Sequence, residues 1–461
     1  MEFLGLMAGI LLPTLCGVIW LQIRPLRPAE IGWPTLLGYG YLSGALATTL
    51  LMRLLDLVGI RLGFIAIALS LVCVTAVGFA LGHRTWPTPG ISQFGRDWRS
   101  FNTQPKWHKI AYAFLLALIV VRFGGLALEL VWRPLFPWDA WSQWATKARV
   151  WYEFGHLVPF VAGDVWLSGK LPGAYTDLAP HYPPAIPLLQ VWMSYCLGRW
   201  DDALMNLPWL ACAIALGLAF YGQLRRWEVS PVIAMMFTYF LLSLPMLDTH
   251  VALAGYADLF MAAFYGLAAM AFFHWSKTRS VWQGIVAILF GLGCIFIKQP
   301  GLVWLLTFVP AVLVVLMPRR GVMMVTILGL AGLLGLVMLA QMGTMTLFSY
   351  NVSLQYASAW LPLWQNLFIL DNWHLLWYFL FAAMALALPK LLLPRLRGIT
   401  TLVFTGFAFL GVAFFFTQAQ AWAEDFTTVN RALLHMAPVL MFYIVVLWRE
   451  AAWRPFSTSN A

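Results

Sequence analysis

Long apolar runs recur along the whole chain and are separated by short polar stretches. Many of these runs reach about 18 residues, the length that a helix needs to cross a bilayer. Because lipid offers no water to backbone polar groups, such segments must be helical. The pattern therefore predicts an all-α fold, a polytopic transmembrane bundle of about thirteen spans. The predicted spans cover residues 3–22, 34–58, 62–82, 109–131, 203–222, 231–247, 257–275, 281–297, 301–317, 321–342, 374–389, 399–417 and 432–448.

The composition supports this prediction, since 62% of the residues are hydrophobic and only 10% are charged. Soluble domains carry roughly 25% charged residues. No stretch has the composition of a separate soluble domain. We expect accessory N-terminal transmembrane helices in 1–83, a cytoplasmic linker in 84–108, a transmembrane body in 109–448 and a cytoplasmic tail in 449–461.

The formal net charge of +10 reflects topology rather than a nucleic-acid partner. The loops on one side of the predicted spans hold 18 of the 28 Lys and Arg residues, with only four acids. By the positive-inside rule this side is cytoplasmic. We therefore expect an odd number of spans, with the N-terminus outside and the C-terminus inside. The five cysteines fall mostly within predicted spans, and their spacing matches neither a metal site nor a disulfide framework.

An aspartate between two tryptophans follows the outgoing span 109–131, in the stretch PWDAWSQWATKAR. In a chain with so few charges, an acid at a membrane exit is typical of a functional group, and this makes Asp139 a candidate. The tryptophans beside it also fit an interfacial belt at headgroup level. Lys147 and Arg149 follow within the longest external segment, 132–202. Its Trp- and Pro-rich composition predicts short helices along the membrane surface.

Three more charged residues stand at external ends of later predicted helices. Asp258 opens a helix, where an acid serves equally as a cap or as a functional group. Lys298 occupies a tight Lys-Gln-Pro-Gly turn at membrane level, which suits a lipid phosphate, although a snorkelling lysine also fits there. Arg431 opens the last helix, and its planar guanidinium suits bidentate phosphate binding.

The external loop 343–373 mixes aromatic, amide and hydroxyl side chains, a composition that suits sugar rings and also any interfacial loop. Asp248 and His250 lie two residues apart, so metal binding there is conceivable, but the spacing is unspecific. Further residues near the predicted external surface are candidate substrate contacts. They are Lys147, Arg149, His181, Tyr182, His250, Tyr350, Gln355, Tyr356 and His435.

Two acids and two cations on the external face suit sugar transfer from a lipid-linked phosphate. A carboxylate can take the proton from an acceptor hydroxyl. Fixed cations can stabilise the departing phosphate. The outer compartment has no supply of nucleotide sugars, which favours a lipid donor.

The residues that carry these groups resemble the GT-C superfamily of integral-membrane glycosyltransferases, of the aminoarabinose and mannosyl transferase type. The resemblance spans roughly 109–448 and rests on PWDAW, HYPPAIPLLQVW, YADLFMAAF, FIKQPGLVWLL and NRALLHMAP in this order. It implies that Asp139 is the catalytic base or positions the acceptor, and that Asp258 is the second acid. Lys298 and Arg431 would then contact the donor phosphate. The three helices before the body, and the lack of a large soluble C-terminal domain, depart from the family pattern.

The resemblance also implies a hexosyl- or pentosyltransferase that uses a polyprenyl-phosphate sugar, in some members with a divalent metal ion such as Mg²⁺ or Mn²⁺. The acceptor would be lipopolysaccharide, another glycan, a lipid or a protein. A bacterial inner membrane with a periplasmic active site is expected by the same resemblance. The N-terminus would then be periplasmic.

Two alternatives use the same residues differently. A transporter or flippase of a lipid-linked or anionic solute would show internal repeats and broken helices with polar groups near mid-membrane. We find no convincing repeat in the sequence. A non-catalytic membrane scaffold would leave the external acids and cations without a purpose.

Overall fold

The computed structural model describes residues 2–23, 31–82, 101, 103–339, 344–347, 350–353 and 356–452. Helices make up most of these residues, which confirms the predicted all-α, polytopic fold. The N-terminal half of the chain contains α1 (Glu2–Trp20), α2 (Trp33–Leu57), α3 (Phe64–Gly82), α5 (Lys106–Trp132), α6 (Thr146–Phe154), α7 (Gly163–Leu167), α8 (Ala185–Leu197), α9 (Leu207–Arg226), α10 (Pro231–Leu242) and α11 (Pro245–Ala252).

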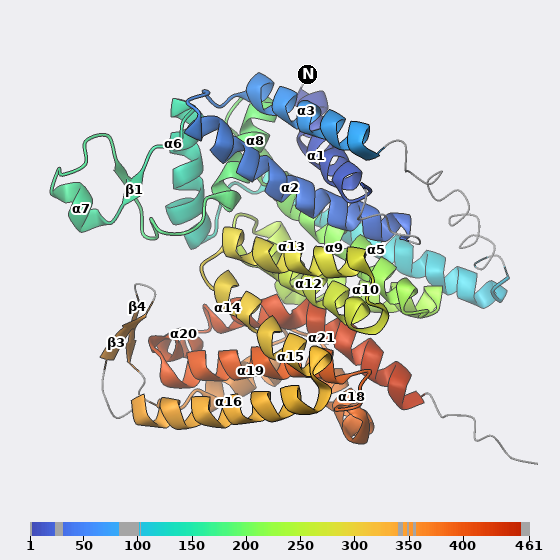
Figure 1. Ribbon diagram of the computed structural model, residues 1–461. Helices are drawn as coiled ribbons and strands as arrows, with labels where there is room; N and C mark the ends of the chain where they lie inside the picture. Colours follow the sequence, from blue (N-terminus) through green and yellow to red (C-terminus); the bar gives the residue numbers. More distant parts are fainter. Residues whose placement is uncertain are drawn as a thin grey trace, which may run out of the picture.

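The C-terminal half continues the same architecture (Figure 1). It contains α12 (Asp258–Thr278), α13 (Val281–Ile297), α14 (Gly301–Leu306), α15 (Phe308–Leu316), α16 (Pro318–Leu339), α17 (Trp360–Trp364), α18 (Leu376–Ala387), α19 (Arg397–Phe416), α20 (Ala421–Glu424) and α21 (Val429–Ala452). The described strands form two short pairs, β1 (Phe160–Val161) with β2 (Tyr175–Thr176) in parallel, and β3 (Thr344–Leu347) with β4 (Tyr350–Ser353) antiparallel. Shorter helical turns cover Ala140–Ala145, Leu204–Asn206, Gln365–Ile369, Leu388–Lys390 and Gln418–Gln420.

Nine helical segments of the described chain are long and apolar enough to cross a membrane. Each coincides with one of the predicted spans, so the sequence pattern located them correctly. They are Glu2–Trp20, Trp33–Leu57, Phe64–Gly82, Lys106–Trp132, Leu204–Arg226, Asp258–Thr278, Pro318–Met338, Arg397–Phe416 and Val429–Ala451.

The predicted count of about thirteen spans is wrong, because four of the apolar runs do not form long straight helices. The run 231–247 is broken into α10 and α11, which meet at 61°, and the count of nine rises to ten if this pair is one span. The break lies at Pro245, whose missing N–H ends the preceding helical hydrogen-bond pattern. The other three runs form shorter helices, of which α13 has 17 residues. At 1.5 Å per residue such a helix rises about 26 Å, less than the roughly 30 Å hydrocarbon core.

The interior of the bundle is built around α12 and α21, whose most apolar windows are 89% and 83% buried. The corresponding window of α16 is only 6% buried, so this helix presents its leucine-rich surface outward. In a bilayer such a surface contacts lipid tails, which are as apolar as leucine. The two central helices begin at or near the charged residues that form the candidate site.

The predicted accessory helices share this interior through buried hydrogen bonds. The indole of Trp282 in α13 donates to the Leu21 carbonyl at 3.0 Å. In α2, the Tyr39 hydroxyl donates to the Leu267 carbonyl at 2.8 Å and accepts from Gln223 at 2.7 Å. The helices therefore pack on the body, whereas their separate role stays a prediction.

The segment 132–202 contains the predicted short helices α6 and α7, and α7 has no buried residue. The third helix, α8, differs from this prediction because nearly all of its residues are buried. Most of its 13 residues are apolar, which favours packing against protein over lying at the membrane surface.

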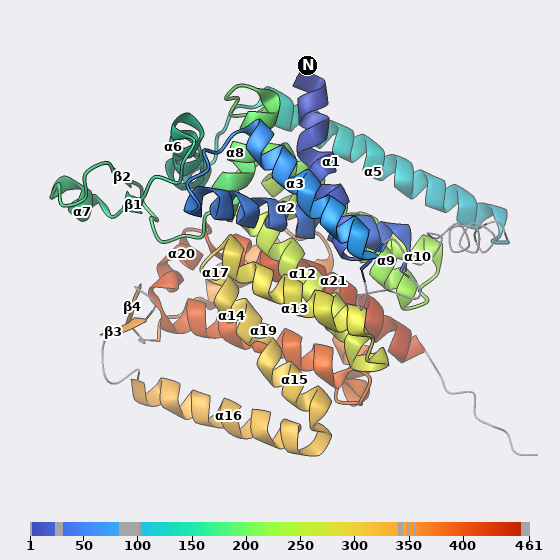
Figure 2. The same cartoon turned by 45° about the horizontal axis from the view of Figure 1, so that its top comes forward.

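The two ends of the bundle carry different segments (Figures 1 and 2). The elements α6, α7, β1, β3, β4 and α20 gather at one end, on the left of Figure 1. The beginning of α5 and the end of α21 lie at the opposite end. This grouping agrees with the predicted division of loops between two sides, and which side is cytoplasmic stays a prediction.

Candidate active site

Asp258 lies at the centre of a buried charged cluster. It is the first residue of α12, and its side chain is completely buried. One carboxylate oxygen accepts from Lys298 Nζ at 2.8 Å and from His435 Nε2 at 2.9 Å, and the other accepts from Arg431 Nε at 2.8 Å. Ala257 holds the N-cap position, so capping alone does not explain this acid.

Arg431 connects the two predicted acids. Its Nη1 lies 2.5 Å from Asp139 Oδ2, while its Nε contacts Asp258 Oδ2 at 2.8 Å. The guanidinium also lies over the ring of Tyr256, 4.3 Å from the ring centroid, a cation–π contact. Because the planar guanidinium has several donors in fixed directions, a single side chain can hold both carboxylates.

His435, one turn further along α21, is held in one tautomer. The Trp304 indole N–H donates to His435 Nδ1 at 3.0 Å. An indole is only a donor, so Nδ1 must be unprotonated. The proton then sits on Nε2, which donates to Asp258 at 2.9 Å. In this network His435 is a neutral hydrogen-bond donor.

Lys298 reaches the cluster from a tight turn between α13 and α14. The amide of Gly301 donates to the Lys298 carbonyl at 2.9 Å, which closes the turn. A Cβ at position 301 would lie 1.9 Å from the Cys294 carbonyl oxygen, so only glycine allows the two helices this approach. The tight turn predicted from Lys-Gln-Pro-Gly is confirmed.

Asp139 is brought to the cluster by a close contact between the PWDAW stretch and the turn before α12. Gly255 has φ +113°, and a Cβ there would lie 2.6 Å from the Ala140 side chain. The tryptophans on either side of Asp139 are exposed, and the rings of Trp138 and Trp141 meet edge to face at 4.8 Å. They form an aromatic surface beside the acid.

The exposed fractions of the five side chains define a direction of access. They fall from 23% for Asp139 through 15% for Arg431 and 11% for Lys298 to 4% for His435 and zero for Asp258. A ligand would therefore meet Asp139 and Arg431 first. Asp258 instead contacts Lys298 and Arg431 from the buried side of the cluster.

Lys147 lies in the same external segment as Asp139, but its contacts indicate a structural role. Its ammonium contacts Asp177 at 2.9 Å and donates to the Ala179 carbonyl at 2.6 Å, with both ionic side chains almost fully buried. Burial lowers the pKa of the Lys147 ammonium, and the Asp177 carboxylate opposes that shift. This pair ties the arm around α7 to α6.

Three other candidates from the external segment 132–202 make contacts outside the charged cluster or are exposed. Arg149 forms an ion pair with Glu153 at 2.6 Å and lies over the Trp200 ring at 5.0 Å. Tyr182 stacks on Trp144 with ring centroids 5.3 Å apart. His181 is exposed. The Trp144–Tyr182 stack connects the segment PWDAWSQWATKAR with the Tyr-Pro-Pro segment.

His250 lies beside the cluster through Tyr256, with ring centroids 5.5 Å apart. Its Nδ1 hydrogen bonds the Met246 carbonyl at 2.8 Å. Asp248 instead forms an ion pair with Arg122 of α5. The two residues therefore engage different partners, and this arrangement does not support the metal-binding alternative.

The candidates of the loop 343–373 are only partly described. Tyr356 is exposed and stacks on Phe415 of α19 with centroids 6.2 Å apart. The side chain of Tyr350 in β4 and the whole of Gln355 lie outside the described residues.

The charged cluster does not fit a resident divalent cation. The Asp258 oxygens already accept from Lys298, Arg431 and His435, and Asp139 contacts the same arginine. Elsewhere in the described residues, no group of three or more His, Cys, Asp or Glu side chains is placed to hold a metal ion.

Three kinds of site residue were missing from the candidates. Tyr256 contacts Arg431, and Trp304 donates to His435. Tyr256 and Trp304 both lie within the quoted motifs. The third is an amide network, in which Asn430 accepts from Asn366 and from Asn372, the latter at 3.3 Å. It fixes the start of α21, and no spacing in the sequence indicates these distant partners.

No family model, curated protein or solved structure matches this chain. The fold and the nine or ten candidate spans identify it as a multi-pass helical membrane protein.

Proposed function

We propose that the charged cluster is the active site of a membrane glycosyltransferase of the GT-C type. The observation that carries this proposal is the bridge from Arg431 to both Asp139 and Asp258. Asp139, Asp258, Lys298 and Arg431 were selected for acid–base and phosphate chemistry, and they come from four distant segments. They form one connected network, which also includes His435.

The proposed donor is a polyprenyl-phosphate sugar, whose phosphate binds Arg431 and Lys298. Within the cluster the two acids balance these two cations. An incoming phosphate adds negative charge, so it would compete with Asp139 for Arg431. Asp139 is the more exposed of the two acids and can leave, whereas buried Asp258 keeps both cations in position.

In the proposed reaction, an acceptor hydroxyl attacks the anomeric carbon of the sugar. The new bond joins the acceptor oxygen to that carbon, and the bond from carbon to the phosphate oxygen breaks with its electron pair. Asp139 takes the hydroxyl proton as the general base. The lipid phosphate leaves with one additional negative charge, which Arg431 and Lys298 stabilise. We place no metal ion in this reaction.

The acceptor in this proposal is a glycan, a lipid or a protein at the periplasmic face of a bacterial inner membrane. The exposed pair Trp138 and Trp141 beside Asp139 supports a carbohydrate substrate, since sugar faces are apolar and stack on aromatic rings. The apolar surfaces between helices would hold the polyprenyl chain. The GT-C resemblance of the motifs supports the same assignment.

The test compares Asp139→Asn with wild type in membranes that contain equal amounts of inserted protein. The readout is mass spectrometry of surface glycans and envelope proteins from cells that express each form. We expect wild type to add a sugar of defined mass and Asp139→Asn to lower its transfer at least about 100-fold, because general acid–base catalysis contributes that much or more.

Asp164→Asn is the matched control, because Asp164 is an exposed acid of α7 in the same external segment. It should transfer the sugar as wild type does. Equal transfer by Asp139→Asn and wild type would exclude Asp139 as the base. A wild type that adds no sugar would contradict the glycosyltransferase proposal.

A transporter or flippase remains the second candidate, and the break between α10 and α11 favours it. Broken helices with polar groups are typical of transporter binding sites. Here Arg122 donates to the Ser243 carbonyl at the break and pairs with Asp248 just beyond it. Uptake or flipping of a labelled anionic lipid by reconstituted protein, lost in Arg122→Gln and kept in Asp139→Asn, would favour this candidate.

A further inference from the structure

A large cavity lies at the end of the bundle opposite the charged cluster. Its volume is about 920 Å³. His274 and Thr278 near the end of α12 line it, together with Arg449 near the end of α21. These two helices begin with Asp258 and near Arg431, and α12 has 21 residues. At 1.5 Å per residue, the cavity and the cluster are about 30 Å apart.

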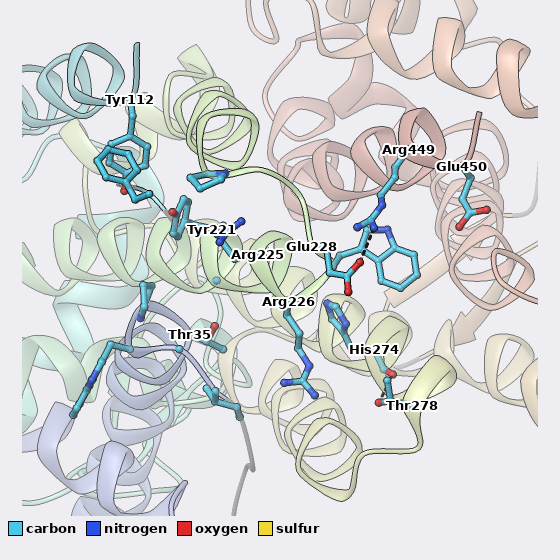
Figure 3. Close-up of a pocket in the computed structure, with 18 of the residues that line it drawn as sticks. Thr35, Tyr112, Tyr221, Arg225, Arg226, Glu228, His274, Thr278, Arg449 and Glu450 are labelled. Atoms are coloured by element: carbon cyan, nitrogen blue, oxygen red, sulfur yellow. Dashed lines mark hydrogen bonds and ion pairs between the residues drawn. The ribbon is translucent and has the colours of Figure 1, made fainter. Parts of the chain in front are cut away.

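Basic side chains dominate the polar lining of this cavity (Figure 3). Four arginines line it against two glutamates, of which Glu228 pairs with Arg449 at 2.9 Å. Figure 3 shows Arg225 and Arg226 at the end of α9 on one side of the cavity and Arg449 on another. The lining arginines are Arg225, Arg226, Arg395 and Arg449.

Aromatic rings complete the walls of this basic cavity. Aromatic side chains gather at membrane interfaces, where one edge is apolar and the other wet. A cavity with guanidinium groups and aromatic walls at the end of transmembrane helices suits a phosphate-bearing headgroup. The aromatic lining residues are Trp33, Phe101, Tyr112, Tyr221 and Trp227.

The positive-inside rule explains basic residues at a cytoplasmic end, but it requires no cavity. Arg319 and Arg320 illustrate this simpler role. They are exposed in the first turn of α16, which follows α14 and α15 away from the Lys298 turn. Neither of them lines the cavity, whereas Arg225 and Arg226 do.

We propose that this cavity is a binding site for a phosphate-bearing ligand, separate from the candidate active site. A phosphate monoester or diester gives the arginines the oxygen acceptors that a guanidinium binds in pairs. The ligand is either the headgroup of an anionic membrane lipid or a soluble phosphate ester. The site does not depend on the proposed glycosyltransferase activity.

The test measures binding to purified full-length protein in a neutral detergent. One arm titrates phosphatidylglycerol against phosphatidylcholine, and the other titrates soluble glycerol phosphate. Thermal denaturation reports stabilisation, and native mass spectrometry counts bound molecules. We expect stabilisation by phosphatidylglycerol over phosphatidylcholine if the source is lipid, or by glycerol phosphate if it is soluble. No preference for either phosphate ester in wild type would overturn the proposal.

Arg226→Gln with Arg449→Gln removes two of the cavity's positive charges. This double variant should weaken binding at least about tenfold, because losing one hydrogen bond to a charged group already costs about that factor. Arg319→Gln with Arg320→Gln removes the same charge outside the cavity and should bind as wild type. Equal weakening in both double variants would overturn the site, since general surface charge would then explain the binding.

Asp139→Asn separates this proposal from the proposed activity. It changes the distant cluster and should leave phosphate-ester binding at the cavity unchanged. If the Arg226 and Arg449 variant does not fold, the wild-type titrations still decide between binding and no binding.

Discussion

At the scale of single residues, the main feature of the cluster is the fixed state of His435. Trp304 occupies Nδ1 as a donor, so the imidazole offers Asp258 only its Nε2–H. A histidine in a candidate active site often suggests a general base. Here its two nitrogens are both engaged, which indicates a positioning role for the Asp258 carboxylate.

We therefore expect that a glutamine at position 435 can make the same two hydrogen bonds as His435. The amide of glutamine can accept from Trp304 through oxygen and donate to Asp258 through nitrogen. His435→Gln should keep sugar transfer within a few-fold of wild type, whereas His435→Leu should lower it at least about tenfold by leaving buried partners unsatisfied. The measurement is transfer activity at equal amounts of membrane protein. Equal loss in both variants would show that the imidazole itself is required.

Asp139 and Asp258 differ in how far their side chains are exposed. Both acids contact Arg431, but only Asp139 is exposed enough to meet an acceptor. The sequence identified both residues from their positions at helix ends. It contained no signal that one arginine would contact both, because that contact depends on how α12 and α21 pack.

At the scale of elements, the turn between α13 and α14 determines where Lys298 lies. Gly301 allows the start of α14 to pass within contact distance of Cys294 in the last turn of α13. A longer connection would let the ammonium move away from Asp258. The tight turn between the short helices α13 and α14 thus fixes the position of Lys298 in the cluster.

Gly301→Ala should disturb both stability and the site. Its Cβ would lie 1.9 Å from a backbone oxygen, so the helices must shift, at a cost of about 1–3 kcal/mol. We expect a lower melting temperature in detergent and reduced sugar transfer.

The matched control is Gly332→Ala in α16, where a Cβ would meet nothing within 4 Å. Alanine is favoured over glycine in a helix interior by roughly 0.5–1 kcal/mol, so this variant should melt no earlier than wild type. If Gly301→Ala behaved like this control, the tight turn would not be needed to place Lys298.

The elements also show how far the sequence could predict the fold. Nine long apolar runs are helices as expected, because length and hydrophobicity suffice to specify a span. The same criterion failed at 231–247, since hydrophobicity does not reveal a 61° bend. The prediction from Trp- and Pro-rich composition failed at α8, whose apolar residues pack on protein in a segment expected at the membrane surface. Hydrophobic surfaces look alike in sequence whether they face lipid or other helices.

The cavity at the other end was not predicted from the sequence at all. Its arginines were interpreted only as a topological signal. The cavity lies where the ends of α2, α5, α9, α10, α12 and α21 meet, and no local sequence pattern encodes that meeting. The distant partners Asn366 and Asn430 are hidden for the same reason, since 64 residues separate them along the chain.

At the scale of the whole molecule, the two proposed sites lie at opposite ends of the bundle, which the predicted topology places in opposite compartments. The arm around α7 lies at the end that carries Asp139, and α16 begins at the other end. Between them run α9, the bent pair α10 and α11, and α12, followed by α13 and then α14 with α15. The helix α13 and the pair α14 and α15 are joined by the Lys298 turn. The chain therefore runs out along α13 and returns along α14 and α15 to the side it came from, so these helices add two crossings or none. With the bent pair counted as one crossing, both possibilities leave an odd number of crossings.

Single cysteines at Ser168 and Arg320 test this sidedness directly. Both residues are exposed, one next to α7 and the other at the start of α16. Cys73 is the exposed native cysteine and is replaced by serine, while Cys16, Cys196, Cys212 and Cys294 are buried. In intact spheroplasts, a membrane-impermeant maleimide should label Ser168→Cys but label Arg320→Cys only after the membrane is permeabilised. Labelling of both before permeabilisation would contradict the odd crossing number. Labelling of Arg320→Cys alone would reverse the orientation and place the acid cluster on the cytoplasmic side, where nucleotide sugars are available and a lipid donor is no longer required.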